Sequence, residues 1–213
     1  MTEAKRSSQI KSKKRVAEHG EVFTAQREVN AMLDLVDADI RCIYKIILEP
    51  AVGEGVFLLE ILNRRFAMID NFCVTGWELE WDILQAISSL YGVDIQSDNV
   101  TITRNKIISK IDSYVASKRH VSSAGFKRTL GVILQKNIII GDTLSCCNVD
   151  KTELRFSEWQ FYKDGVISRR EYTLQELINN QSGKSNRRLY YYAWMKRNIY
   201  PSAIECFSNY AVA

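Results

Sequence analysis

Residues 49–55 have the composition of a turn that could hold a nucleoside against the backbone. This segment joins a short apolar run, 44–48, which suits a buried strand, to a nearly continuous apolar run, 56–62, which is compatible with a helix. Gly53 and Gly55 allow backbone angles that other residues avoid, and they carry no side chain that would keep a ligand away. A helix that begins at such a turn points its free N–H groups into the same crevice. Two close glycines alone are weak evidence, because turns between strands and helices also use glycine for structural reasons.

The acid and the proline that precede these glycines make the pattern more specific. The segment resembles the S-adenosylmethionine (SAM) motif of adenine-N6 DNA methyltransferases, which is commonly written D/E-P-A-C-G-x-G-x-F. It resembles that motif at Glu49, Pro50, Ala51, Gly53, Gly55 and Phe57. The resemblance implies that these six residues bind SAM as the cofactor.

Three further segments resemble motifs of the same family, and they occur in the family's order. The first, 20–24, resembles the N-terminal G-x-x-[FY]-T-P element, with Ala25 where the proline usually stands. The second, 91–95, resembles the second strand with its terminal acid, and the third, 137–144, resembles the third strand with its aspartate. The resemblance covers residues 13–144, about two-thirds of the chain. It adds to the predicted cofactor site Phe23, Thr24, Asp94, Ile95, Asp142 and Thr143.

The resemblance gives each of three acids a role in holding SAM. Asp94 would accept hydrogen bonds from the ribose hydroxyls, because the carboxyl end of a strand borders the ligand crevice of a doubly wound sheet. Asp142 would accept one from the exocyclic amine of the adenine, and Glu49 would face the positively charged methionine end. Each acid could instead be a solvated strand end or a helix cap, which is the commoner role of one such residue alone. The 39 residues from Gly55 to Asp94 exceed the ~20 of a dinucleotide-binding unit, so we expect an insertion, with the stretch 77–90 as the candidate.

The chain lacks the motif with which adenine-N6 methyltransferases hold the acceptor base. That motif, [DNS]-P-P-[YFW], supplies oxygens for the two amine hydrogens and an aromatic ring that stacks on the flipped base. The only prolines of this chain are Pro50 and Pro201, and the residues around Pro201 do not match. The sequence therefore assigns no catalytic residue.

The order of apolar patterns predicts an α/β fold. Apolar residues with helical spacing occur in 27–37, 98–115 and 126–134, and the last of these leads directly to a strand at 138–140. Strands that alternate with helices indicate a parallel sheet. Together with the motifs, this order predicts a Rossmann-like class I SAM-methyltransferase fold. We expect a flexible basic arm, a SAM-binding core and an appendage that completes the same domain, at residues 1–15, 16–144 and 145–213.

The appendage is expected to contain an atypical β-hairpin followed by a helix. Residues 163–165 are a turn signal between two strand-like runs. The alternation slips within the first run, which predicts a bulge near Ser157. Residues 173–176 have the spacing of a capping box that begins a short helix. Trp159 and Phe161 are more typical of a hairpin core than of a platform for stacked bases.

Positive charge is concentrated near the N-terminus. Residues 1–15 carry six basic side chains and one acidic side chain, whereas the whole chain has a net charge of +4, so the remainder is close to neutral. The arm is either a disordered, solubilising tail or a binding segment for DNA phosphates. A second basic cluster, 184–197, is interleaved with aromatic residues, and it fits DNA binding and an amphipathic helix about equally. The predicted DNA-binding residues are Lys11, Lys13, Lys14, Arg15, Arg187 and Arg188.

The composition is that expected of a soluble cytoplasmic protein. No apolar run reaches the ~18 residues of a membrane span, and the N-terminus lacks the apolar core of a signal peptide. The five cysteines have no C-x-x-C spacing, and the chain has two histidines, so we expect reduced thiols and no metal site.

These features predict a SAM-dependent adenine-specific DNA methyltransferase, or a modification subunit of a restriction-modification system. In either case another chain would have to supply target recognition or the catalytic loop. The alternative is a SAM-binding module without catalysis that serves as a regulatory or assembly subunit. A methyltransferase for a small molecule or a protein is a third, less favoured class. An adjacent reading frame that encodes N-P-P-Y would favour the first prediction over the second.

Overall fold

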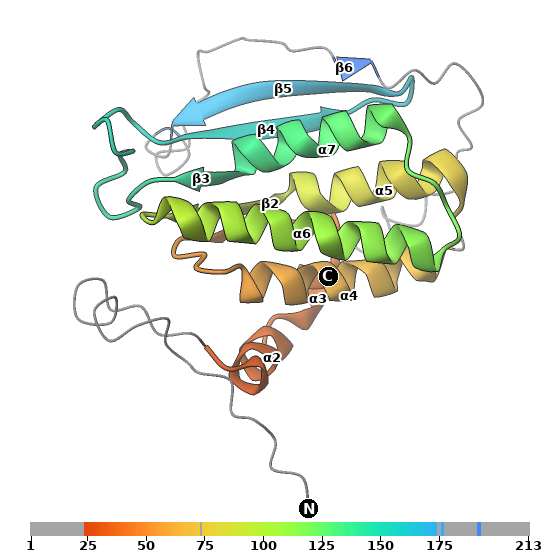
Figure 1. The fold of residues 1–213 in the computed structure, drawn as a ribbon, viewed down its shortest axis with the longest axis horizontal. Helices are drawn as coiled ribbons and strands as arrows, with labels where there is room; N and C mark the ends of the chain where they lie inside the picture. The colour runs from red at the N-terminus through yellow and green to blue at the C-terminus, as the bar shows by residue number, and fades with distance from the viewer. Residues whose placement is uncertain (1–23, 73, 174–175, 177–190, 193–213) are drawn as a thin grey trace, which may run out of the picture.

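The computed structural model describes residues 24–72, 74–173, 176 and 191–192, which form a mixed α/β structure (Figure 1). The helices are α2 (Gln26–Asp34), α3 (Asp37–Arg41), α4 (Val56–Asp70), α5 (Gly76–Ser88), α6 (Ser97–Ser117) and α7 (Ala124–Asn137). The strands are β1 (Ile47–Glu49), β2 (Leu90–Asp94), β3 (Ile138–Ile140), β4 (Arg155–Phe161), β5 (Val166–Thr173) and β6 (Tyr191–Tyr192).

Three short strands form a parallel sheet in the order β1-β2-β3. Ile47 pairs with Leu90, and Gly92 pairs with Ile138. Each crossover contains two helices: α4 and α5 connect β1 to β2, and α6 and α7 connect β2 to β3. The second helix of each pair leads almost directly into the next strand. Because the strands are parallel, their carboxyl ends meet at one side of the sheet, which we call the carboxyl edge.

The core is built where the helices and the hairpin meet the sheet. α4 packs against α2, α3, α5 and α6, whereas α5 and α7 pack against each other and against β4. In Figure 1 the β4–β5 hairpin lies near the top, β2 and β3 lie below it, α3 and α4 lie lower still, and α2 is the lowest labelled helix. The central residues have no exposed surface: Leu58, Leu62, Ile83, Ile87, Ile107 and Ile133.

A buried arginine of α4 fixes the approach to β1. Arg65 donates hydrogen bonds to the backbone carbonyls of Ile40, Lys45 and Ala86 and to the hydroxyl of Ser89. Burial lowers the pKa of Arg65 to about 10, so the guanidinium is still protonated at neutral pH. One side chain thus ties together the end of α3, the segment before β1 and the end of α5.

The predicted C-terminal hairpin is confirmed, but the predicted bulge is wrong. β4 and β5 are antiparallel and are joined by a tight turn. Their pairing runs without interruption from Arg155 opposite Thr173 to Phe161 opposite Ile167, so Ser157 is an ordinary paired residue. A regular strand therefore carries the irregular apolar pattern.

The pattern is irregular because different parts of β4 pack against different clusters. Phe156 packs against Tyr91 of β2, with ring centroids 5.9 Å apart. Trp159 and Phe161 instead pack against the main core, and the ring of Phe161 meets that of Trp81 edge-on at 5.1 Å. The prediction that both aromatic residues belong to the hairpin core is confirmed.

The predicted helices are confirmed with one difference, and the stretch 77–90, expected as an insertion, forms α5. Residues 27–37 form two helices instead of one, because the backbone leaves the helical conformation at Val36. The prediction of a buried strand at 44–48 is wrong: β1 spans Ile47–Glu49, and Tyr44, Ile46 and Leu48 are exposed because no described strand covers this side of the sheet. The capping box is also confirmed: Thr173 and Glu176 each accept a hydrogen bond from the other's backbone N–H. The helix that it would begin lies outside the described residues. Among the described helices, none combines the length and apolarity needed to cross a membrane.

Candidate functional site

Two glycines shape the turn after β1. Gly53 and Gly55 have φ angles of 51° and 81°, in the left-handed region that favours glycine. The N–H of Gly55 donates to the carbonyl of Val52 at 2.8 Å. The N–H of Val52 donates to the carbonyl of Val93, also at 2.8 Å. A Cβ atom at Gly55 would lie 2.8 Å from Cγ2 of Thr103, whereas a Cβ atom at Gly53 would have nothing within 4 Å. The turn is therefore packed at Gly55 and open at Gly53.

Asp94 holds this turn from the end of β2. Its Oδ2 accepts a hydrogen bond from the N–H of Gly53 at 2.7 Å, and its Oδ1 accepts from the N–H of Gln96 at 2.8 Å and from Nδ2 of Asn99 at 3.3 Å. Asp94 is 9% exposed. A carboxylate has about four acceptor sites, so three protein donors leave little capacity for a ribose diol. The ribose contact stays a prediction, and the geometry gives Asp94 a structural role beside it.

Two further hydrogen bonds connect the 137–144 segment to the 91–95 segment and to the turn after β1. The N–H of Gly141 donates to the backbone carbonyl of Asp94 at 2.9 Å. The hydroxyl of Thr143 donates to the carbonyl of Pro50 at 3.2 Å. With the bond from Gly53 to Asp94, these contacts join the three motifs in a closed ring at the carboxyl edge.

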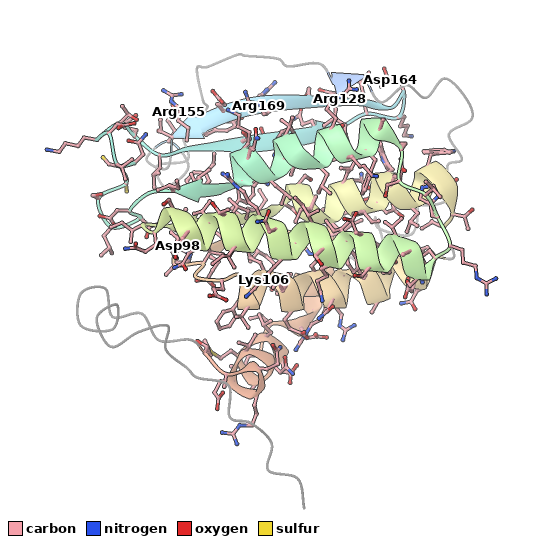
Figure 2. All side chains as sticks on the ribbon, viewed as in Figure 1. Asp98, Lys106, Arg128, Arg155, Asp164 and Arg169 are labelled. Atoms are coloured by element: carbon pink, nitrogen blue, oxygen red, sulfur yellow. The ribbon has the colours of Figure 1, made fainter. Side chains whose placement is uncertain are left out.

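Two side chains of α6 brace the turn from outside. The hydroxyl of Thr103 donates to the carbonyl of Gly53 at 2.8 Å, and Nζ of Lys106 lies 2.6 Å from Oε2 of Glu54. Figure 2 labels Lys106 on α6, together with Asp98 near the start of that helix. Sequence reasoning missed both contacts, since the partners are 50 and 52 residues apart. The one available signal was their spacing of three, which places both residues on the same face of a helix.

In the described part of the chain Glu49 forms no ion pair, like Asp94 and Asp142 and unlike Glu54, which pairs with Lys106. Glu49 is half-buried at the end of β1, and its Oε1 accepts a hydrogen bond from the N–H of Ala51 at 3.3 Å. Burial raises the pKa of Glu49, and the bond from Ala51 opposes this rise. A cation bound beside Glu49 would stabilise the ionised carboxylate.

Asp142 begins the loop that follows β3. Hydrogen bonds from the hydroxyl of Ser145 and from the N–H of Leu144 hold the pKa of Asp142 below its usual range. Its backbone N–H and carbonyl pair with those of Cys147. The carboxylate is therefore ionised and held in place beside the closed ring.

The remaining predicted residues have different surroundings. Ile95 is 54% exposed directly after β2, and Pro50 and Ala51 are exposed in the turn. Phe57 is half-buried and packs against the main core. Thr24 is exposed before α2, which packs against α3 and α4. Outside the described residues lie Phe23, Lys11, Lys13, Lys14, Arg15, Arg187 and Arg188.

A groove of about 640 Å³ lies between α4 and α6. Its walls include Phe66 and Tyr114, whose stacked rings have centroids 3.9 Å apart, and Asp70, which accepts a hydrogen bond from the Tyr114 hydroxyl at 2.6 Å. None of the predicted cofactor residues lines this groove. Lys106, which braces the glycine turn through Glu54, also lines this groove, so the groove adjoins the carboxyl edge without containing the predicted cofactor residues.

The carboxyl edge combines an exposed apolar side chain, Ile95, a half-buried acid, Glu49, and a turn that is open at Gly53. Among the described residues, no group of three or more His, Cys, Asp or Glu side chains is placed to hold a metal ion. No protein-family model, curated protein or solved structure matches the chain. Its function is therefore inferred from the motifs and from the geometry of the edge.

Proposed function

We propose that the chain binds SAM at the carboxyl edge and acts in adenine-specific DNA methylation, as a methyltransferase or as a modification subunit of a restriction-modification system. The observation that carries this proposal is the closed ring of hydrogen bonds among the turn after β1, Asp94 and the 141–143 segment. Motifs that are far apart in the sequence and resemble one cofactor site are neighbours in space. The strand order β1-β2-β3 also agrees with one half of a doubly wound sheet. We therefore propose that this sheet belongs to a Rossmann-like class I fold.

The surroundings of the acids fit a cofactor with a positive and an apolar end. Glu49 would face the methionine end, whose sulfonium and ammonium groups are cationic. Ile95 would contact the adenine, since it is an exposed apolar residue directly after Asp94. Gly53 would let the backbone approach the ligand, because the space where its side chain would be is open.

The chain lacks a [DNS]-P-P-[YFW] loop, so we propose that a partner supplies the acceptor half of the reaction. Binding SAM does not by itself position an adenine amine. Orientation of the two reactants can account for ~7–11 kcal/mol of a barrier, so the isolated chain should transfer methyl groups too slowly for ordinary detection. The partner would also contribute target recognition.

The second candidate is a SAM-binding regulatory or assembly subunit without catalysis. The missing loop favours it, whereas the closed ring supports both candidates equally. A partner encoded beside this chain and carrying N-P-P-Y would support the first candidate, since the two chains together would then contain all the motifs.

Transfer of labelled methyl groups from SAM to adenine-containing DNA separates the candidates. The methylating candidate predicts N6-methyladenine when the chain is combined with its N-P-P-Y partner, and loss of the product with Gly53→Arg. The regulatory candidate predicts SAM binding without transfer in any combination. Product formed by the isolated chain would show that it contains a catalytic loop of its own, and residues 142–161 would be the place to look for it.

A further inference from the structure

β1 has one neighbouring strand, β2, in the part of the chain that the structure describes. The N–H of Ile47 donates to the carbonyl of Ser89 at 2.9 Å, which shows that the peptide groups of Ile47 face β2. Successive residues of a strand direct their peptide groups to opposite sides. The N–H and carbonyl groups of Ile46 and Leu48 therefore point to the open side of β1.

The same two residues expose apolar side chains. Ile46, which directly precedes β1, is 68% exposed, and Leu48, which lies within β1, is 40% exposed. Leu48 is in register with Tyr91, which the hairpin covers through Phe156. The hairpin therefore shields β2 and leaves the neighbouring side chains of β1 in contact with solvent.

The length of the open edge is limited at both ends. Pro50 has no N–H to donate, and the chain bends at Lys45, whose N–H is already bonded to the carbonyl of Cys42 at 3.1 Å. A short edge flanked by proline and lysine resists the addition of long strands. A partner strand must therefore match a window of about three residues.

The three-residue window 46–48 is complementary to a second copy of itself. In an antiparallel arrangement of two copies, Ile46 of each copy lies opposite Leu48 of the other, and both residues direct their peptide groups into the interface. Lys45, which is 59% exposed and forms an ion pair with Asp39 at 3.1 Å, lies at the end of this window, toward Glu49 of the other copy, so the charges at the ends are opposite. A parallel arrangement would instead bring like residues together.

We propose that two copies of the chain associate through β1, in antiparallel register, to form a continuous six-stranded sheet. The contact is isologous, so the pair closes without further growth. It contains about four main-chain hydrogen bonds and two apolar side-chain pairs. It occupies the side of β1 that would pair with the next strand in a complete doubly wound sheet, and it lies beside Glu49 of the proposed cofactor site. Because this is a small interface, we expect a dissociation constant on the order of 100 µM.

Sedimentation over a range of concentrations, from about 5 µM to about 500 µM, tests this association. The chain should pass from monomer to dimer, and Leu48→Lys and Ile46→Lys should each keep it monomeric. Lys45→Glu should weaken the dimer while leaving the apolar edge intact. The matched control is Val121→Lys, because Val121 is apolar, 86% exposed and outside β1; this variant should dimerise normally. Thermal melts of every variant confirm that it is folded.

Hydrogen exchange at the Leu48 amide identifies the surface that forms the contact. This amide should exchange freely in dilute samples and become protected as the dimer forms. Monomeric behaviour at all concentrations, or a dimer that is unaffected by both lysine variants, would overturn the proposal. Protection of Leu48 that does not depend on concentration would also overturn it, because another segment of the same chain would then occupy the edge.

Discussion

The N–H of Gly53 donates to Oδ2 of Asp94 at 2.7 Å, which joins the glycine turn to the end of β2. The acid that the sequence marks as a ribose ligand is thus also the acceptor that holds the turn. Substitution of Asp94 should therefore change the shape of the turn, and the proposed function predicts that it also weakens cofactor binding.

Asp94→Asn should destabilise the ligand-free protein. Its amide nitrogen cannot accept the bonds that the carboxylate accepts, so at least one buried N–H loses its partner. Hydrogen bonds to charged groups are worth ~1.5–3 kcal/mol, and we expect a decrease of this size in the free energy of unfolding measured in urea. Asp112→Asn, on the exposed side of α6, is the control and should change stability little. If Asp94→Asn were as stable as the parent chain, the structural role of Asp94 would be wrong.

Gly55→Ala should cost more stability than Gly53→Ala. A side chain in the left-handed region costs roughly 1–2 kcal/mol at either position. At Gly55 the new Cβ would also meet Thr103, which is fixed by its bond to the turn, whereas the space at Gly53 is open. Thr103→Ser removes the closest contacting atom and should recover part of the extra cost in a double-mutant cycle. Equal costs at the two glycines would contradict the described packing.

The contribution of Asp82 to stability should fall as pH rises from about 4 to about 6. Burial, together with the charge of Glu78, raises the pKa of Asp82 to about 6. Between the ordinary and the raised pKa the folded state keeps the proton that the unfolded state has released, so a rise in pH favours unfolding. The size of this contribution is at most about 3 kcal/mol. Asp82→Asn should flatten the profile of unfolding free energy across this window, and an unchanged profile would exclude Asp82 as its source.

Deletion of residues 1–15 should weaken binding to duplex DNA equally for all sequences. For each DNA phosphate that Lys11, Lys13, Lys14 or Arg15 neutralises, the deletion should reduce the slope of log K against log salt by ~0.9. Binding measured at several salt concentrations gives the slope. If the slope does not change, the arm binds no phosphates and is a solubilising tail.

The elements and the position of the cofactor motifs could be predicted because each has a local signal. The helical spacing of 98–115 indicates α6, and the run of isoleucines at 138–140 indicates β3. The glycine turn, Asp94 and Asp142 could be assigned to one edge because parallel strands bring their carboxyl ends together.

The bonds that shape the site have no local signal. Whether Asp94 faces a ligand or the turn depends on the position of Gly53, 41 residues away. The bracing by Thr103 and Lys106 depends on how α6 packs against the turn. The bulge near Ser157 was wrongly predicted because alternation shows which side chains are apolar, whereas the paired strand decides the register.

Calorimetric titration with SAM tests the central claim, that the carboxyl edge binds this cofactor. We expect a single site in the parent chain and no binding heat with Gly53→Arg, whose long side chain would occupy the open space of the turn. Gly53→Ala has the same backbone strain and should retain binding, so it separates damage to the site from damage to the fold. No heat at millimolar SAM in a folded sample of the parent chain would contradict the claim.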